Sequence, residues 1–302
     1  MSAVCHTDGF GIYLINDLGK QLIGIHEDDD KLSYAIEEGT VKVCRHSFAK
    51  NKHLELIEFP QSLQQVEEDA FNNGPRDMHF ISHSAAAAVD GDYLLDAGAH
   101  MVLFYTGNEA EIHIPSSVTV LGKQSFRGCS AETLILDAQI KEIHEDAFTT
   151  SHIERVFFTD SQSYVYFPKK DIRLRQHMLS GFGNNGIFDF ERYDNDLTAG
   201  FMEDERMRMI AARLKWPLHL NQETEEKYRR IISSKLDAAL QCVGQANDLF
   251  TLQLFFETEI INETNIEQVL ASLHILKDLE AYAYAMDYQA HHFSSHEFDF
   301  KI

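Results

Sequence analysis

The sequence predicts a multidomain α+β protein: a short β-solenoid over residues 1–165, followed by an all-α helical domain over residues 166–302. Two observations predict this architecture. Short apolar segments in the first half recur about every 22 residues, a spacing typical of strand-bearing repeats. Beyond Phe167-Pro168 the apolar residues follow a helical period instead.

The repeat is marked by a small residue followed by phenylalanine. The four copies of this pair are Ser47-Phe48, Ala70-Phe71, Ser125-Phe126 and Ala147-Phe148. The two phenylalanines of the first pair of copies are 23 residues apart and those of the second pair are 22 residues apart. No single repeat can bury its own apolar face, so stacked copies must supply the core. We therefore expect the four phenylalanines to form a ladder inside the solenoid.

A larger duplication includes the repeats. The segment 13–17 resembles the segment 93–97, and each precedes a pair of repeats at an offset of 77 to 80 residues. Asp90-Gly91 provides a residue pair that favours the positive φ of a tight hairpin turn. The sequence thus predicts two copies of a β-hairpin followed by two repeats.

The segment 114–130 resembles the BspA-type, or treponemal-type, leucine-rich repeat. That unit reads roughly Ile-Pro-x-Ser-Val-x-x-Ile-Gly-x-x-Ala-Phe-x-x-Cys, and this copy includes the matching Gly122 and Cys129. The copies at 40–52 and 138–150 lack the Ile-Pro-x-Ser opening. The resemblance covers residues 12–158 and implies a leucine-rich-repeat solenoid. In relatives with secretion signals it implies surface adhesion and binding of host proteins.

Alternation along the expected strands separates core residues from surface residues. In the strand expected over residues 54–59, we expect Leu54, Ile57 and Phe59 to point inward. Strand faces are the usual contact surface of such solenoids. The predicted outward, partner-binding residues are Glu55, Glu58, His79, Ile135, Arg155 and Phe157. Outward apolar groups suit a partner surface, although the helical domain could equally cover Ile135 and Phe157.

The second half is predicted to form paired helices in a small bundle or a loosely ankyrin-like stack. The expected helices span residues 169–180, 200–214, 222–241, 246–257, 264–273 and 276–290. Thr264 and Glu267 have the spacing of a capping box. Trp216-Pro217 is expected to end the second helix, because proline disfavours helical geometry in the residue before it.

Charge and motif content exclude several functions. The net charge is −22, and both halves carry more acidic than basic residues, which disfavours nucleic-acid binding. There is no apolar run long enough for a membrane span. The four cysteines are scattered, as expected of free thiols in a reducing compartment. No catalytic, cofactor-binding or metal-binding residue is predicted. The Gly181–Gly186 motif follows an expected helix, so we interpret it as a turn, and the histidines of segment 291–297 as a solvated tail.

The sequence therefore favours a non-enzymatic protein–protein interaction module with an unidentified protein partner and no cofactor. A bacterial adaptor or regulator in the cytoplasm is the first expectation if the chain begins at its natural N-terminus. An adhesin-type surface protein is the alternative if a secretion signal was removed. An enzyme with its site in the helical domain and a metal-binding role for the histidine-rich tail are the remaining alternatives.

Overall fold

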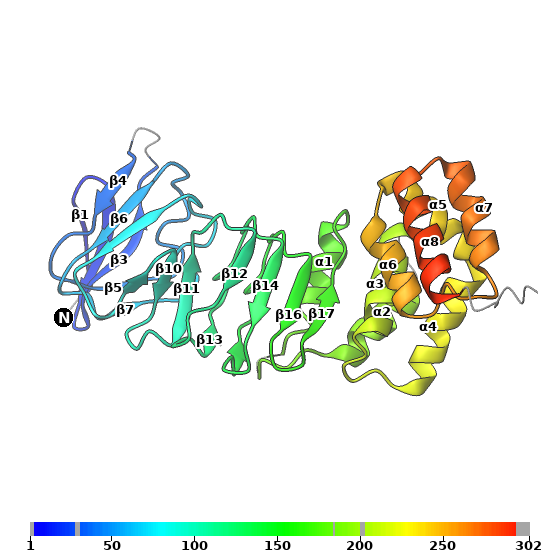
Figure 1. The fold of residues 1–302 in the computed structure, drawn as a ribbon. Helices are drawn as coiled ribbons and strands as arrows, with labels where there is room; N and C mark the ends of the chain where they lie inside the picture. The colour runs from blue at the N-terminus through cyan, green and yellow to red at the C-terminus, as the bar shows by residue number, and fades with distance from the viewer. Residues whose placement is uncertain (1–2, 28–30, 184, 200–202, 294–302) are drawn as a thin grey trace, which may run out of the picture. The chain divides into compact units, whose positions relative to one another are not determined.

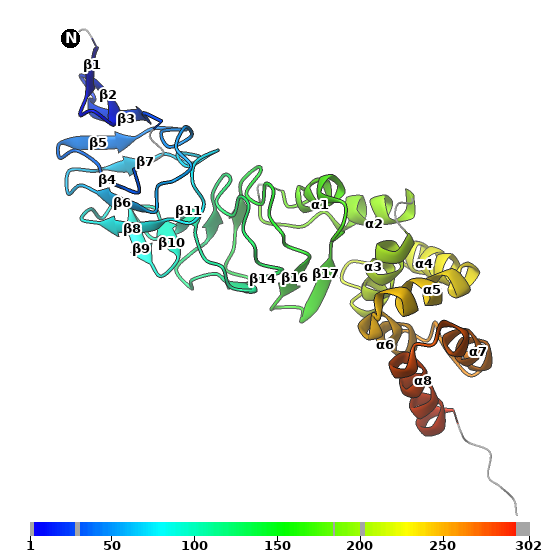
Figure 2. The ribbon, with the colours of Figure 1, turned by 90° about the horizontal axis from the view of Figure 1, so that it is seen from above.

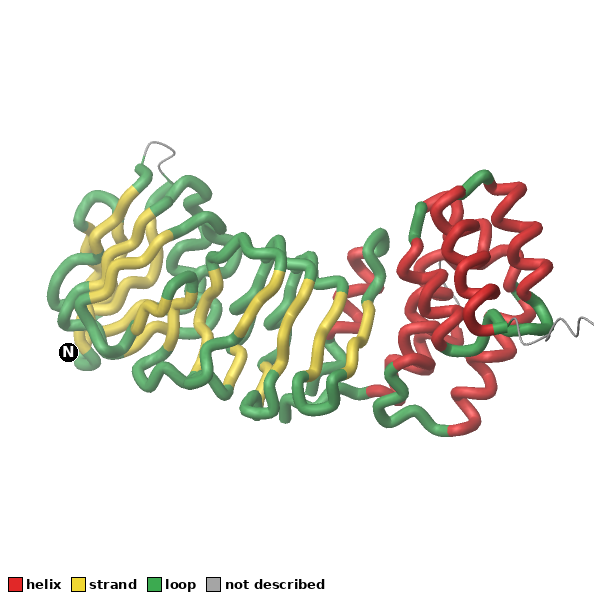
Figure 3. The backbone as a smooth tube through the Cα atoms, viewed as in Figure 1, coloured by secondary structure: helices red, strands yellow, loops and turns green. Residues whose placement is uncertain are grey.

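A computed structural model describes residues 3–27, 31–183, 185–199 and 203–293. Strands fill the first part of the chain and helices the second (Figure 1, Figure 3). By contacts the chain divides into a solenoid unit, residues 1–162 with 169–189, and a helical unit, residues 163–168 with 190–302. The predicted fold class, a β-solenoid followed by helices, is confirmed. The predicted division at residue 165 stays a prediction.

The strands of the solenoid unit are short, as the repeat length requires. They are β1 (Val4–Thr7), β2 (Gly11–Asn16), β3 (Gly19–Ile25), β4 (Ser33–Ala35), β5 (Thr40–Val43), β6 (Leu56–Phe59), β7 (Gln65–Val66), β8 (His79–Ser82), β9 (Ala88–Asp90), β10 (Tyr93–Leu95), β11 (Met101–Tyr105), β12 (Glu111–His113), β13 (Val120–Leu121), β14 (Thr133–Leu136), β15 (Glu142–Ile143) and β16 (Arg155–Phe158).

Each half of the solenoid unit contains two sheets. In the first half, the antiparallel hairpin β2–β3 continues through parallel β5 and β7, giving the order β1-β2-β3-β5-β7 (Figure 2). Strands β4, β6 and β8 form a second, parallel sheet. In the second half, β9-β10-β11-β13-β15 repeats the first arrangement, and β12, β14 and β16 repeat the second. A hairpin therefore begins each half and extends the sheet of the shorter repeat strands.

The core of the solenoid contains the predicted phenylalanine ladder. Phe48 and Phe71 stack with their ring centroids 5.0 Å apart, and Phe126 and Phe148 lie 5.9 Å apart. All four side chains are buried, which confirms the prediction. Strand β11 extends the ladder between the two halves, because Phe104 contacts Phe71 at 5.2 Å and Tyr105 contacts Phe126 at 5.4 Å.

The position three residues after each ladder phenylalanine is buried in every copy. The residues there are Asn51, Gly74, Cys129 and Ser151. A Cβ atom at Gly74 would lie 2.9 Å from the carbonyl oxygen of Phe48, so this copy has no room for a side chain. Asn51 fits because its side-chain oxygen accepts the backbone N–H groups of His53 and Leu54, both at 2.8 Å. The limited space in this turn thus accommodates either a small residue or one whose side chain hydrogen-bonds to the neighbouring backbone.

Helix α1 (Ile172–Leu179) and the turn after it pack on the last repeat of the solenoid unit. The Phe182 ring lies 5.8 Å from Phe148 and 6.3 Å from Phe158. Phe182 and Phe188 form an isolated antiparallel bridge that closes this turn. The helix and the following turn were both expected from the sequence, and they cover apolar rings at the end of the ladder.

The helical unit begins with strand β17 (Ser163–Tyr166) and continues with seven helices among the described residues. These are α2 (Phe190–Ala199), α3 (Glu203–Lys215), α4 (Gln222–Ser234), α5 (Leu236–Ala246), α6 (Leu249–Glu257), α7 (Ile266–Leu276) and α8 (Leu279–His292). Helix α3 ends before Trp216-Pro217, as predicted. In the described part of the chain, none of the helices has the length and apolarity to cross a membrane.

Three details of the helix prediction were wrong. Helix α2 was not expected, because Asp194 interrupts its apolar pattern. The segment 222–241 is two helices, since Lys235 leaves helical geometry with φ −128° and ends α4. The Thr264–Glu267 capping box does not form: α7 begins at Ile266 after Asn265, and the backbone N–H of Thr264 donates instead to the Asn262 side chain.

A buried ion pair connects three helices of the helical unit. Arg213 on α3 donates to both carboxylate oxygens of Asp194 on α2, at 2.8 and 2.9 Å. The Tyr228 hydroxyl on α4 donates to the same carboxylate at 2.9 Å. Because a charge buried without a partner is costly, these three groups must stay together for the helices to pack.

Candidate partner-binding surface

The outer face of β12, β14 and β16 carries two rows of side chains set by the parallel register. One row is His113, Ile135 and Phe157, which pair directly from strand to strand. The other is Glu111, Thr133 and Arg155. The residues between them, Ile112, Leu134 and Val156, are buried with no exposed surface and point into the core. The alternation therefore places Ile135, Arg155 and Phe157 on the outside, as predicted.

Polar side chains frame the apolar pair on this face. The Arg155 guanidinium donates from Nε to the Thr133 hydroxyl at 2.6 Å. At the other edge, the His113 ring lies 3.8 Å from the Glu111 carboxylate. Ile135 and Phe157 are half-buried and adjacent. An apolar centre with a polar margin is the composition of a protein contact surface.

The outer face of β4, β6 and β8 has the same strand register but carries different side chains. Its rows are Ser33, Leu56 and His79, and Ala35, Glu58 and Ile81. Leu54, Ile57 and Phe59 are buried, as predicted. The Glu58 carboxylate pairs with the His83 ring at 2.7 Å, and Ile81 is 44% exposed. A carboxylate and an aliphatic side chain, Glu58 and Ile81, thus occupy the positions that correspond to Ile135 and Phe157 of the second half.

The six predicted partner-binding residues lie on two separate sheets. Glu58 and His79 occupy the outer face in the first half, while Glu55 precedes β6 and is exposed at the start of that strand. Ile135, Arg155 and Phe157 lie together on β14 and β16. Sequence reasoning missed other residues of the same rows, among them Leu56, Ile81 and His113. A strict two-residue alternation from Glu58 and His79 would have found Leu56 and Ile81, whereas His113 follows only from the strand register.

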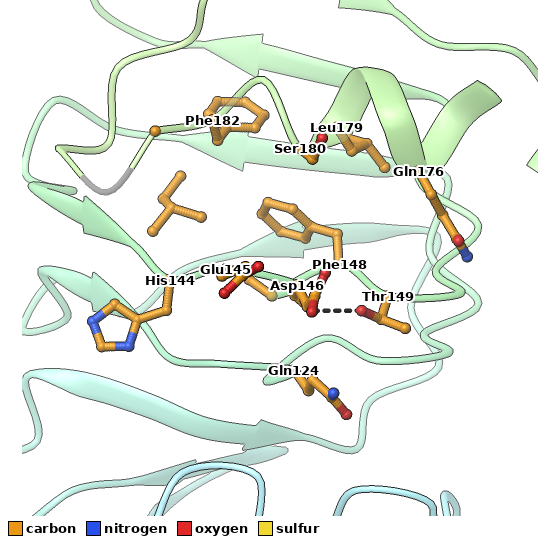
Figure 4. A pocket seen from close by; sticks show the side chains of 13 residues that line it. Gln124, His144, Glu145, Asp146, Phe148, Thr149, Gln176, Leu179, Ser180 and Phe182 are labelled. Atoms are coloured by element: carbon orange, nitrogen blue, oxygen red, sulfur yellow. Dashed lines mark hydrogen bonds between the residues drawn. The ribbon is translucent and has the colours of Figure 1, made fainter. Parts of the chain in front are cut away.

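A cavity of about 510 Å³ lies at the end of the solenoid unit, between the turn after β15 and the segment that includes α1 (Figure 4). Phe148, Leu179 and Phe182 form its apolar wall. Gln124 also lines the cavity, and its Oε1 atom is buried without a hydrogen-bond partner among the described residues. The carboxylate-bearing residues Glu145 and Asp146 are exposed.

Two polar residues that line this cavity, His144 and Ser180, are engaged in hydrogen bonds. The His144 ring is held between the carboxylates of Glu68 and Glu142. The Ser180 hydroxyl donates to the carbonyl of His177 at 2.7 Å. These bonds leave neither group arranged as a nucleophile–base pair. Within the described ranges, no group of three or more His, Cys, Asp or Glu residues could hold a metal ion.

A buried tyrosine pair closes the N-terminal end of the solenoid unit. Asp8 accepts hydrogen bonds from the hydroxyls of Tyr13 at 3.0 Å and Tyr34 at 2.8 Å, and from the backbone N–H groups of Phe10 and Gly11. Burial opposes the charged form of Asp8, but these bonds outweigh it and hold the pKa of Asp8 below its usual value. Burial raises the pKa of Tyr13 to about 12 and also raises the pKa of Tyr34.

None of the four cysteines, all of which lie in the described ranges, is part of a disulfide. Cys5 is exposed, Cys44 and Cys242 are partly buried, and Cys129 is fully buried. Burial raises the pKa of the Cys129 thiol to about 11. Of the histidine-rich tail, His291 and His292 lie at the end of α8, while residues 294–297 fall outside the described residues.

Comparison with known proteins identifies the repeats. The family model described as BspA type leucine rich repeat region matches six copies, over residues 31–85 and 100–169. Among curated proteins, no relative matches this chain.

Three solved structures have a weak similarity to this chain. A leucine-rich repeat protein from Eubacterium ventriosum matches with a TM-score of 0.33 and 11% identity, over 41% of this chain and 43% of that one. A leucine rich cell surface protein from Faecalibacterium prausnitzii matches with a TM-score of 0.32 and 16% identity, over 51% and 40%. The pneumococcal vaccine antigen PcpA matches with a TM-score of 0.22 and 11% identity, over 51% and 69%. The matched part of the present chain thus spans less than half of each of the first two structures.

Proposed function

Because residues 31–85 and 100–169 belong to the BspA-type leucine-rich-repeat family, we propose that this chain is a non-enzymatic protein-interaction module. The binding surface is the outer face of β12, β14 and β16, called the second strand face below. Its exposed and half-buried residues are Glu111, His113, Ile135, Arg155 and Phe157, while Thr133 of the same face is buried and accepts a hydrogen bond from Arg155.

The observation that carries this proposal is the adjacency of Ile135 and Phe157. Both side chains point away from the core, at directly paired positions of neighbouring strands. Hydrogen-bonded and charged groups surround them, so a partner would cover the apolar pair while water stays at the edge. The corresponding positions of the first half, Glu58 and Ile81, pair a carboxylate with an aliphatic side chain instead.

The net charge of the chain indicates which surface charge a partner should have. The net charge is −22, so electrostatic attraction favours a partner with a basic surface. Charges at the edge of an interface act mainly on the association rate and are screened by salt. We expect association to slow as ionic strength rises, while dissociation depends on how well Ile135 and Phe157 are covered.

Two matched double variants test the surface. Ile135→Ser with Phe157→Ser removes the apolar pair, and Leu56→Ser with Ile81→Ser makes the equivalent change on the outer face of β6 and β8. The wild-type chain is used to capture proteins from a lysate of the native organism, and a captured protein is identified, produced and titrated by calorimetry. Circular dichroism and melting curves check that both variants fold.

The proposal predicts that the Ile135/Phe157 variant weakens affinity by at least about 30-fold, since central apolar contacts typically contribute about 2 kcal/mol or more. The Leu56/Ile81 variant should stay within about threefold of wild type. Equal loss in both variants, no loss in either, or no specific capture would contradict this assignment. A captured adaptor or regulatory protein would support the finer expectation of an adaptor role.

A further inference from the structure

Helix α8 is apolar on two sides, although it covers the helical unit with only one. Ala281 and Ala285 are buried against the unit. On the other side, Leu279 is 80% exposed and Met286 is 48% exposed, with exposed Ala283 between them. A helix at the surface of a globular unit normally carries polar residues on its outer side. The second apolar side therefore indicates that α8 contacts another molecule.

The contacts within the unit use the inner side of α8. The Tyr288 ring lies 4.4 Å from Phe256 on α6, and the Tyr282 ring lies 5.7 Å from His274 on α7. Helices α7 and α8 follow α5 and α6 in the helical unit (Figure 2). Helix α4 provides the comparison, because its exposed residues are all polar or charged: Gln222, Glu223, Glu226, Lys227, Arg230, Ser233 and Ser234. The outer side of α8 thus differs from an ordinary solvated helix face.

The order of residues along this side is self-complementary. Leu279, Ala283, Met286 and Ala290 follow each other at helical spacings of four, three and four residues, so they share one face. If the helix is laid antiparallel on a copy of itself, Leu279 faces Ala290 of the copy and Met286 faces Ala283 of the copy. Each large side chain then meets a small one, which lets two helices approach closely. The centre of this face carries no charge.

We propose that the outer side of α8 is a self-association surface, on which two copies of this chain pack α8 against α8 about a two-fold axis. Such an isologous contact uses the same patch on both copies. This inference is independent of the strand-face function. Ile275, at the end of α7 and four residues before Leu279, is also 77% exposed.

The size and charge of the contact set its expected strength. A helix of 14 residues is about 21 Å long, so a contact between two copies of α8 alone is smaller than a standard interface of about 1,600 Å². We therefore expect dissociation in the micromolar range. Glu280 and Asp287 lie along one edge of α8 and would lie along the same edge of both copies. Salt should consequently strengthen the dimer by screening this repulsion.

Sedimentation velocity of the full chain tests the proposal, at concentrations from about 1 to about 200 µM on either side of the expected dissociation constant. Wild type should shift from monomer to dimer across this range, and the shift should move to lower concentration at higher salt. Leu279→Glu with Met286→Glu should weaken the dimer by at least about 30-fold, because it buries carboxylates in the contact. Arg230→Glu on α4 is the matched control and should leave the dimer unchanged.

A further variant separates specific packing from general stickiness. Ala283→Leu makes the face more apolar but sets a large side chain against Met286 of the copy, so the proposed pairing predicts a weaker dimer. Stronger association of this variant would overturn the pairing. A wild-type chain that stays monomeric throughout, or a dimer that survives the Leu279/Met286 change, would overturn the proposal, and the first result would assign the face to a different protein.

Discussion

The two halves of the solenoid unit share one topology but present different outer faces. Each half joins a hairpin to a sheet of short strands and sets a second parallel sheet beside it. The interior is nearly interchangeable, with Phe48 and Phe71 in one half corresponding to Phe126 and Phe148 in the other. On the outside, Glu58, which pairs with His83, and Ile81 in the first half correspond to the adjacent Ile135 and Phe157 of the second.

The difference between the two outer faces indicates which positions of the repeat can vary in sequence. The inward residues and the buried position after each ladder phenylalanine are limited by volume, so even the cysteine of the best-matching copy is a packing residue and not a reactive one. The outward residues of the same strands have no such limit. They can therefore be specialised for binding without changing the fold. Among the described strands of these two parallel sheets, large apolar side chains occupy directly paired outward positions in the second half and not in the first.

The largest expected effect concerns the ladder. Phe48→Ala and Phe126→Ala should each lower the free energy of unfolding by about 3 to 5 kcal/mol, because both side chains are fully buried. Ile81→Ala, at an exposed position, should cost less than about 1 kcal/mol. Urea unfolding followed by far-UV circular dichroism measures all three. A loss in only one ladder variant would show that the two interiors are not equivalent.

The buried position after the ladder phenylalanine gives the next effect. Gly74→Ala should destabilise the chain by about 1 to 3 kcal/mol, since the new Cβ atom would lie 2.9 and 3.0 Å from two backbone oxygens. Cys129→Ala removes one sulfur atom from a filled site and should cost about 1 kcal/mol. Thermal melting of both variants measures which substitution destabilises the chain more. Equal tolerance of both substitutions would mean that the turn of the first half can relax.

A smaller and pH-dependent loss of stability is expected when Asp8, at the N-terminal end of the first half, is replaced. Asp8→Asn should lower stability by about 1 kcal/mol at neutral pH, because it removes a charge-assisted acceptor for two tyrosines. The pKa of Asp8 is lower in the folded chain than its ordinary value of 3.8. The Asp8 carboxylate therefore stabilises the fold at pH values above 3.8, and this stabilisation is lost as the pH falls through the pKa of the folded state. Unfolding measured from neutral to acidic pH should show the wild type and the variant converging below that value. A difference that stays constant down to the lowest pH would contradict this account.

The smallest expected effect is on thiol reactivity and leaves stability unchanged. Cys44 is partly buried, whereas Cys129 is fully buried with its pKa raised to about 11. In the folded chain, Cys5 should react first with a thiol-specific reagent, Cys44 more slowly, and Cys129 only when the chain unfolds. Mass spectrometry of peptides after timed labelling measures the order. Labelling of Cys129 at the rate of Cys44 would show that the second half opens locally.

The sequence predicted the features that depend on short, strongly patterned segments. The ladder phenylalanines and the inward residues Leu54, Ile57 and Phe59 could be found because each repeats a fixed spacing. Helix α2 was missed because its buried Asp194 resembles a surface residue until its partner Arg213, 19 positions away, is known. Contacts between distant residues are invisible to a local pattern.

The candidate surface was predicted in part for the same reason. Alternation placed Ile135 and Phe157 outward, and the paired register of β14 and β16 brings them together. The expected strand over residues 54–59 was longer than β6, which begins at Leu56, so Glu55 was counted as a strand residue. His113 was missed because β12 is only three residues long and shows no clear alternation.

The most direct test of the difference between the two outer faces is site-specific photocrosslinking. The photoreactive amino acid p-benzoylphenylalanine is placed at Phe157 in one chain and at Ile81 in another, and each is irradiated in a lysate of the native organism. We expect a defined crosslinked protein from position 157 and none from position 81. The same adduct from both positions, or an adduct only from position 81, would contradict the assignment of binding to the second strand face.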